Sequence, residues 1–190
     1  MKLRAGTDKK LTSGWARQTQ MVRAGTMRSE LGEMSEALFL TSGFSYETAE
    51  EAEARFDGRA EGYTYSRQSN PNLTMLETRM ALLEGAETGR ATATGMAAMT
   101  TSLLAGLRAG DHVLGARALF GSCRWLLDEL LPRYGIETTV IDGTDLDAWK
   151  KGVRPNTKVF FLETPANPTL EIIDLKSVAD IAHENGAKLV

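Results

Sequence analysis

The sequence predicts an α/β fold in which a mostly parallel sheet carries helices on both faces. From about Gly62 to the end of the chain, short apolar segments alternate with segments of helical periodicity, an order typical of parallel sheets. The composition, 42% hydrophobic and 25% charged over 190 residues, is close to the average of soluble globular proteins. We therefore expect residues 61–190 to form the first part of an α/β domain, preceded by an N-terminal arm over residues 1–60.

The expected arm is rich in small and charged residues and shows little sustained periodicity. Short helices are expected within it. Residues 46–56 are the clearest candidate, because their acidic side chains occupy early turns, where the helix dipole favours negative charge.

The first clear helical pattern follows the arm. Four apolar residues recur at helical spacing: Leu73, Leu76, Met80 and Leu83. Gly85 comes next and is suited to end a helix. The pattern predicts a helix whose apolar stripe packs on another surface.

The remaining segments alternate between strand and helix. Strands are expected over residues 91–95, 112–116, 137–142, 158–163 and from Lys188 onward. Helices are expected over residues 96–107, 122–133, 146–150 and 175–185. In such sheets, ligands bind beyond the carboxyl ends of the strands. The last strand would leave the sheet unfinished, so we expect the polypeptide to continue beyond Val190 and this chain to be incomplete at its C-terminus.

Charge and cysteine content narrow the expected partners and location. A net charge of −3 provides no basic field for phosphate backbones or anionic lipid, so neither nucleic acid nor membrane is expected as a partner. The sequence shows no apolar run of the roughly 20 residues that span a bilayer, and no signal peptide. A single cysteine, Cys123, cannot form an internal disulfide, which suits a reducing cytoplasm.

The segment Thr94-Gly95-Met96 is the first candidate for a binding site. It lies where an expected strand meets a helix. Glycine lets the backbone approach a phosphate closely, and the free N–H groups of a first helical turn bind phosphate oxygens. Taken alone, such a junction is more often a simple turn.

Residues 62–72 are the second candidate. Tyr65 and Arg67 are strong donors for a phosphate, and an Asn70-Pro71 turn leads into the next helix. Without further context, an ordinary surface loop explains the same residues.

The third candidate is residues 162–174, at the carboxyl end of the most apolar strand. Prolines are expected to keep this loop extended, and Asn167 can present its amide to a ring substituent. Glu163 is either a site residue or a satisfied carboxylate at the strand end. Phe120, before another helix, can lie flat against a cofactor, although packing in a core is the commoner role of Phe.

Other chemistries lack support in the sequence. His112 and His183 have no Cys or His at metal-ligand spacing, so no metal site is expected. The motifs of a nucleophile elbow, a dinucleotide-binding loop and a Walker loop are absent from the sequence. Cys123 is expected to pack rather than to react.

Four motifs occur in an order that resembles a known family: YSRQSNP at residues 65–71, TGMAA at 94–98, FG at 120–121 and ETPANP at 163–168. From about Thr19 onward, the chain resembles the γ-synthase and γ-lyase family of pyridoxal-phosphate (PLP) enzymes of cysteine and methionine metabolism. The resemblance implies the large domain of PLP-dependent fold type I, with pyridoxal 5'-phosphate as cofactor.

The resemblance also implies roles for individual residues. Backbone N–H groups of Gly95 and Met96 would bind the cofactor phosphate. Tyr65 and Arg67 would bind the same phosphate from a neighbouring subunit.

The cofactor ring would lie between other groups. Phe120 would stack on the pyridine ring, Asn167 would hydrogen-bond the ring hydroxyl oxygen, and Glu163 would support that edge of the site. No catalytic residue is expected in this chain, because the resemblance implies a Schiff-base Lys beyond Val190.

Three positions depart from the usual family pattern. Asn72 stands where Thr is usual, and Thr94 stands where Ser is common. Phe120 stands where many members of the family have Tyr. The last departure matters most, because a phenol can donate a proton and a phenyl ring cannot.

The implied reaction is a γ-replacement that joins sulfide to O-succinylhomoserine or O-acetylhomoserine, giving homocysteine in methionine biosynthesis by transsulfuration. Cystathionine γ-synthase or γ-lyase chemistry is an alternative, as is a non-catalytic cofactor-domain fragment. The implied partners are an amino-acid substrate, sulfide and other copies of the chain, in dimers that share active sites within a homotetramer.

Overall fold

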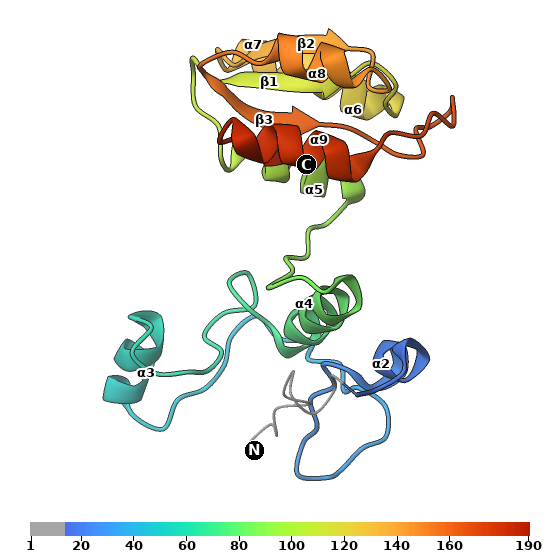
Figure 1. Ribbon diagram of the computed structural model, residues 1–190. Helices are drawn as coiled ribbons and strands as arrows, with labels where there is room; N and C mark the ends of the chain where they lie inside the picture. The colour runs from blue at the N-terminus through green and yellow to red at the C-terminus, as the bar shows by residue number, and fades with distance from the viewer. Residues whose placement is uncertain (1–13) are drawn as a thin grey trace. The chain divides into compact units, whose positions relative to one another are not determined.

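The computed structural model describes residues 14–190 and divides the chain into two compact units, Met1–Ala91 and Thr92–Val190 (Figure 1). The first unit contains helices and loops, and the second contains the parallel sheet. Each unit is described by itself. In the part of the chain that the structure describes, no helix is long and apolar enough to cross a membrane.

The described part of the first unit contains α2 (Arg17–Arg23), α3 (Ala49–Phe56) and α4 (Pro71–Glu84). α3 begins three residues later than its expected start, because the Thr48 side chain caps it by accepting a hydrogen bond from the Glu51 N–H. α4 follows the pattern of its sequence at both ends. Asn70 caps its start, and Gly85 ends it with a φ of 65°, in the left-handed region that favours glycine.

The apolar stripe of α4 is largely uncovered within its own unit. Leu73, Leu76 and Met80 are 40%, 49% and 47% exposed, so the expectation that this stripe packs on a surface is not met there. α4 instead buries Met75 and Ala81. The arm approaches this face closely, since a Cβ at Gly25 would lie 2.8 Å from the Met75 carbonyl oxygen.

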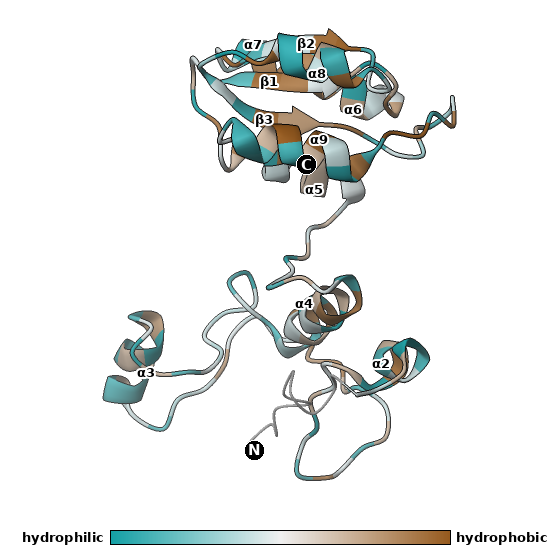
Figure 2. Ribbon diagram, in the orientation of Figure 1, coloured by the Kyte–Doolittle hydropathy of each residue, from teal (hydrophilic) through white to brown (hydrophobic). Residues whose placement is uncertain are grey.

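The second unit has the α/β architecture that the sequence predicts, with a four-stranded sheet in the order β2-β1-β3-β4 and every neighbouring pair parallel. The strands are β1 (His112–Ala116), β2 (Glu137–Ile141), β3 (Thr157–Phe161) and β4 (Lys188–Leu189). The helices are α5 (Gly95–Leu104), α6 (Gly121–Trp125), α7 (Leu131–Arg133), α8 (Leu146–Gly152) and α9 (Leu175–Glu184). Hydrophobic residues concentrate in the strands, for example in β1 and the end of β2 (Figure 2).

Helices cover both faces of the sheet because strand side chains alternate in direction. Val113 of β1 packs in a core with residues of α5, α6 and α7. Its neighbour Leu114 packs in a second core with residues of α8 and α9. All five residues of β1 are buried, as expected for a central parallel strand.

The prediction of a strand over residues 91–95 is wrong. The structure has extended backbone at Thr94, but no strand of the described residues pairs with this segment, so its backbone groups form no ladder. Thr94 instead caps α5, which begins at Gly95, one residue before the expected start.

The helix expected over residues 122–133 exists but contains a π-helical turn, Leu126–Leu130, between α6 and α7. Pro132 accounts for the irregularity, since its ring crowds the carbonyl four residues earlier and it has no N–H to donate. Helical periodicity alone does not reveal this wider turn.

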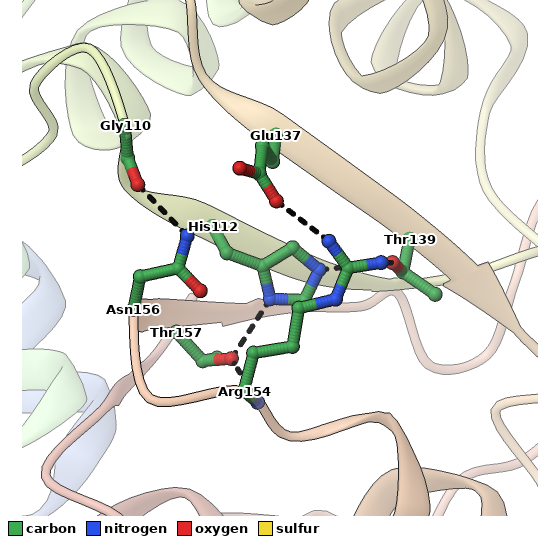
Figure 3. A network of polar contacts seen from close by, with 7 residues as sticks. All are labelled: Gly110, His112, Glu137, Thr139, Arg154, Asn156 and Thr157. Carbon is green, nitrogen blue, oxygen red and sulfur yellow. Dashed lines mark hydrogen bonds and ion pairs between the residues drawn. The ribbon is translucent and has the colours of Figure 1, made fainter.

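A polar network joins three strands at the amino end of the sheet (Figure 3). His112 is fully buried, and its Nδ1 and Nε2 lie 2.8 Å and 2.9 Å from the hydroxyl oxygens of Thr157 and Thr139. Arg154 donates to Thr139 Oγ1 and to a Glu137 carboxylate oxygen. Burial lowers the pKa of His112 most, the charge of Arg154 lowers it further, and Glu137 acts in the opposite direction.

We expect the protein to lose stability in acid, because His112 is buried in this network and is held in its neutral form. Because the folded-state pKa of His112 lies below the ordinary value of about 6.5, the unfolded chain binds more protons as the pH falls through that value. The free energy of unfolding should therefore be highest above about pH 6.5 and should decrease as the pH falls below that value. Denaturant unfolding of the full-length protein from pH 8 to 5 measures this, and His112→Gln should show a smaller acid loss. An equal loss in both proteins would contradict the prediction.

Candidate functional site

Three segments with predicted site residues come together at the carboxyl edge of the sheet. β1 and β3 are neighbours, with Gly115 paired to Phe161, so the loops that follow them start side by side. Figure 1 shows the start of α5 at the same edge. This is the edge where parallel α/β sheets bind ligands.

The start of α5 offers backbone donors. Thr94 Oγ1 accepts a hydrogen bond of 3.1 Å from the Ala97 N–H, while the N–H groups of Gly95 and Met96 have no acceptor among the described residues. A Cβ at Gly95 would meet nothing within 4 Å, so the space on the Cβ side of this residue is open. The geometry suits a phosphate.

Phe120 is not a core residue. Its side chain is 44% exposed at the start of α6, which leaves a flat apolar surface at the edge of the sheet. Asn167, in the loop after β3, is also exposed. A ring and an amide at one sheet edge can bind a flat, substituted aromatic group.

Glu163 connects these two loops. Its Oε2 accepts a hydrogen bond of 2.6 Å from the Phe120 N–H, and its Oε1 accepts one of 3.0 Å from the Asn167 N–H. The sequence left open whether Glu163 is a site residue or a satisfied carboxylate at the strand end. In the structure, both of its oxygens have backbone donors.

The loop over residues 162–174 folds back on itself, so the expectation that its prolines keep it extended is wrong. The Ala166 N–H donates to the Glu171 carbonyl at 3.0 Å, and the Ile173 N–H donates to Thr164 Oγ1 at 2.9 Å. The peptide bonds before Pro165 and Pro168 are cis. Hydrogen bonds within the loop therefore determine the place of Asn167.

Tyr65 and Arg67 lie next to each other in the first unit. The Arg67 guanidinium carbon is 5.3 Å from the centroid of the Tyr65 ring, and both side chains are exposed. The arm holds their loop through a bridge between Gly43 and Tyr65 and a hydrogen bond of 2.8 Å from the Ser66 N–H to the Ser42 carbonyl. A fixed loop thus presents a phenol and a guanidinium together.

Asn72 has a role that sequence reasoning missed. Its Oδ1 accepts from the Phe39 N–H at 2.8 Å, and its Nδ2 donates to the Ala37 carbonyl at 2.7 Å. The side chain therefore ties the arm to the start of α4. Its departure from the usual family residue was the only signal, and the partners lie more than thirty residues away.

Cys123 has no reactive character in this structure. The side chain is buried, and burial raises the pKa of its thiol, with a smaller contribution from the charge of Glu163. Among the described residues, no group of three His, Cys, Asp or Glu side chains is placed to hold a metal. The groups available at this edge are those that bind a flat, phosphate-bearing molecule.

The parallel sheet and the loops at its carboxyl edge place the chain in a general class of protein. Members of this class are α/β domains that bind a ligand at that edge of the sheet. A sequence profile of the Cys/Met metabolism PLP-dependent enzymes matches residues 18–190. The chain belongs to this family, which confirms the resemblance seen in its four motifs.

Individual relatives agree with this assignment. O-succinylhomoserine sulfhydrylase of Mycobacterium tuberculosis (strain ATCC 25618 / H37Rv) is 45% identical over 97% of this chain and 45% of that relative. L-methionine gamma-lyase of Fusobacterium nucleatum subsp. polymorphum is 40% identical over 90% of this chain and 44% of that relative. The chain thus spans less than half the length of these curated relatives.

A solved structure shows the same fold. A putative O-acetylhomoserine (thiol)-lyase from Campylobacter jejuni superposes with a TM-score of 0.88 at 29% identity, over 93% of this chain and 43% of that one. That protein carries N'-pyridoxyl-lysine-5'-monophosphate at its position 205.

Proposed function

We propose that this chain is part of an enzyme that catalyses PLP-dependent γ-replacement, in which sulfide replaces the acyloxy group of O-succinylhomoserine or O-acetylhomoserine to give homocysteine, with release of succinate or acetate. The observation that carries the proposal is 45% identity to an O-succinylhomoserine sulfhydrylase over 97% of the chain. The open donors and the exposed ring at the sheet edge support it, because they suit a cofactor with a phosphate and a flat ring.

Residues of the second unit would bind the cofactor. The N–H groups of Gly95 and Met96 would hold its phosphate, with the α5 dipole favouring the negative charge. Phe120 would stack on its ring, and the Asn167 amide would hydrogen-bond the ring hydroxyl oxygen. When bound, the cofactor supplies an electron sink for the loss of protons next to the reacting carbon.

Tyr65 and Arg67 would complete the phosphate site of another subunit. Their exposed, fixed loop supports this role, since a guanidinium and a phenol presented together are strong phosphate donors. The functional protein would then be a homo-oligomer, with active sites shared within dimers of a tetramer, acting in the cytoplasm.

The phenyl ring of Phe120 restricts what this position does in the reaction. It can stack but cannot move a proton, so proton transfer would fall to other groups. The residue that holds the cofactor covalently would also lie outside residues 1–190. This chain would therefore bind and orient, and it would contain no catalytic residue.

A γ-elimination is the second candidate, because L-methionine gamma-lyases are also similar, at 40% identity. A cystathionine-forming or cystathionine-cleaving enzyme of the same family is a further alternative, as is a fragment without catalysis.

Product analysis of the full-length protein separates these activities. With O-succinylhomoserine or O-acetylhomoserine, we expect sulfide-dependent homocysteine. Cystathionine formed with cysteine, or cleavage of cystathionine or methionine without sulfide, would favour the alternatives. No turnover of any of these substrates by a cofactor-loaded protein would contradict the proposal.

We expect Phe120→Ala to weaken cofactor binding. Loss of aromatic stacking should cost about 1 kcal/mol beyond the buried area, or roughly fivefold in affinity. Equilibrium titration of the cofactor-free, full-length protein measures this. Phe120→Tyr keeps the ring and should retain affinity, as should Tyr134→Ala, which removes an exposed aromatic elsewhere in the unit. Wild-type affinity in Phe120→Ala would rule out stacking.

A further inference from the structure

Glu163 makes an unusual pair of hydrogen bonds for a carboxylate at a strand end. Its two oxygens accept from backbone N–H groups of two different loops, one at Phe120 and one at Asn167. Asp145, which caps α8 at the same edge, accepts instead from the N–H of Asp147 in its own turn. Only the first arrangement can fix one loop relative to another.

The two hydrogen bonds of Glu163 are suited to hold one loop in a fixed position relative to the other. Hydrogen bonds to an ionised carboxylate are shorter and stronger than neutral ones, and the bond from the Phe120 N–H is 2.6 Å long. The two loops differ in local structure, since Phe120 begins a helix and Asn167 lies in a turn between two prolines, and Glu163 hydrogen-bonds to both. Glu163 itself lies two residues after the end of β3, so the rigid sheet supports it.

We infer that Glu163 is a positioning residue, whose carboxylate fixes the spacing between the Phe120 ring and the Asn167 amide. The inference rests on the proposed function, in which Phe120 stacks on the face of the cofactor ring and Asn167 hydrogen-bonds the hydroxyl oxygen at its edge. Glu163 would act through these two backbone N–H groups rather than through a contact of its own with the cofactor ring. Its loss would leave both contact groups present, but it would remove the hydrogen bonds that join the Phe120 loop to the Asn167 loop through one carboxylate.

Glu163→Gln tests this in the full-length protein. The amide keeps one acceptor oxygen but turns an NH2 group toward the second backbone N–H, so one of the two bonds cannot form. Glu163→Asp keeps the charge but is one carbon shorter, and it provides a second variant if the first does not fold. Asp145→Asn is the matched control, since it removes a carboxylate at the same edge whose hydrogen bond stays within its own turn.

Amide hydrogen exchange of the cofactor-free proteins is the first measurement. The Phe120 and Asn167 N–H groups should be protected in the wild type, and at least one should exchange about tenfold faster in Glu163→Gln. The visible circular dichroism of bound cofactor is the second measurement. At saturating cofactor, the band should be reduced in Glu163→Gln and unchanged in Asp145→Asn. Cofactor affinity should fall about tenfold or more in Glu163→Gln.

The outcomes separate the inference from the proposed function. Unchanged exchange at both N–H groups in Glu163→Gln and Glu163→Asp would overturn the connection itself. Faster exchange with an unchanged dichroism band and affinity would overturn the positioning role. If the wild-type protein bound no cofactor, the proposed function would fail, while the exchange measurement would still report on the connection.

Discussion

Two inactive variants of the full-length protein are expected to regain activity when they are mixed. The first is Arg67→Ala, which removes a charge-assisted contact to the cofactor phosphate in the neighbouring subunit. The second lacks the lysine that would hold the cofactor. A mixed dimer combines an intact lysine in one subunit with an intact Arg67 from the other, so one of its two sites is complete.

The amount of recovered activity depends on how often a subunit of one variant pairs with a subunit of the other. Random exchange of equal amounts makes half of the dimers mixed, so roughly a quarter of the wild-type activity should return. Activity per subunit after co-refolding is the measurement, with refolded wild type as the control. If the mixture stays as inactive as its components while the wild type recovers, Arg67 does not act across a subunit boundary.

Trp149→Ala should cause the largest loss of stability in the second unit. Trp149 is fully buried, its ring stacks on Phe160 with centroids 5.1 Å apart, and its Nε1 donates to the Gly143 carbonyl at 2.9 Å. Truncation of a buried Trp costs about 3 to 5 kcal/mol, and the Gly143 carbonyl would lose its partner as well.

Denaturant unfolding of the full-length protein measures this loss. Trp125→Ala is the matched control, because Trp125 is 45% exposed and its ring lies 5.6 Å from the Arg133 guanidinium carbon. Its substitution should cost less than about 1 kcal/mol. Equal losses for the two variants would contradict the assignment of Trp149 to the core.

Much of the second unit could be predicted from periodicity, because its elements are regular. β1 has the expected bounds, and α9 ends within one residue of its expected end. The segment over residues 91–95 could not be assigned from local pattern, since a strand also needs a neighbour to pair with. The π-helical turn before Pro132 depends on one local clash, which a hydrophobic pattern does not record.

The individual residues of the candidate site could be predicted from the sequence, but the hydrogen bonds that connect them could not. Motif order indicated Phe120, Glu163 and Asn167 individually. The bond from Phe120 to Glu163 joins residues 43 positions apart, and only the neighbouring register of β1 and β3 brings them together. The same reasoning applies to Asn72, whose partners in the arm carry no recognisable sequence signal.

The central claim is that residues 1–190 bind a PLP cofactor which another part of the protein holds covalently. Borohydride reduction of the purified full-length protein fixes the cofactor to the lysine that holds it, and digestion with mass spectrometry locates that lysine. We expect about one pyridoxyl group per chain, on a lysine outside residues 1–190. A pyridoxyl group on Lys150, Lys158 or another lysine of this chain, or a protein that takes up no cofactor, would contradict the account.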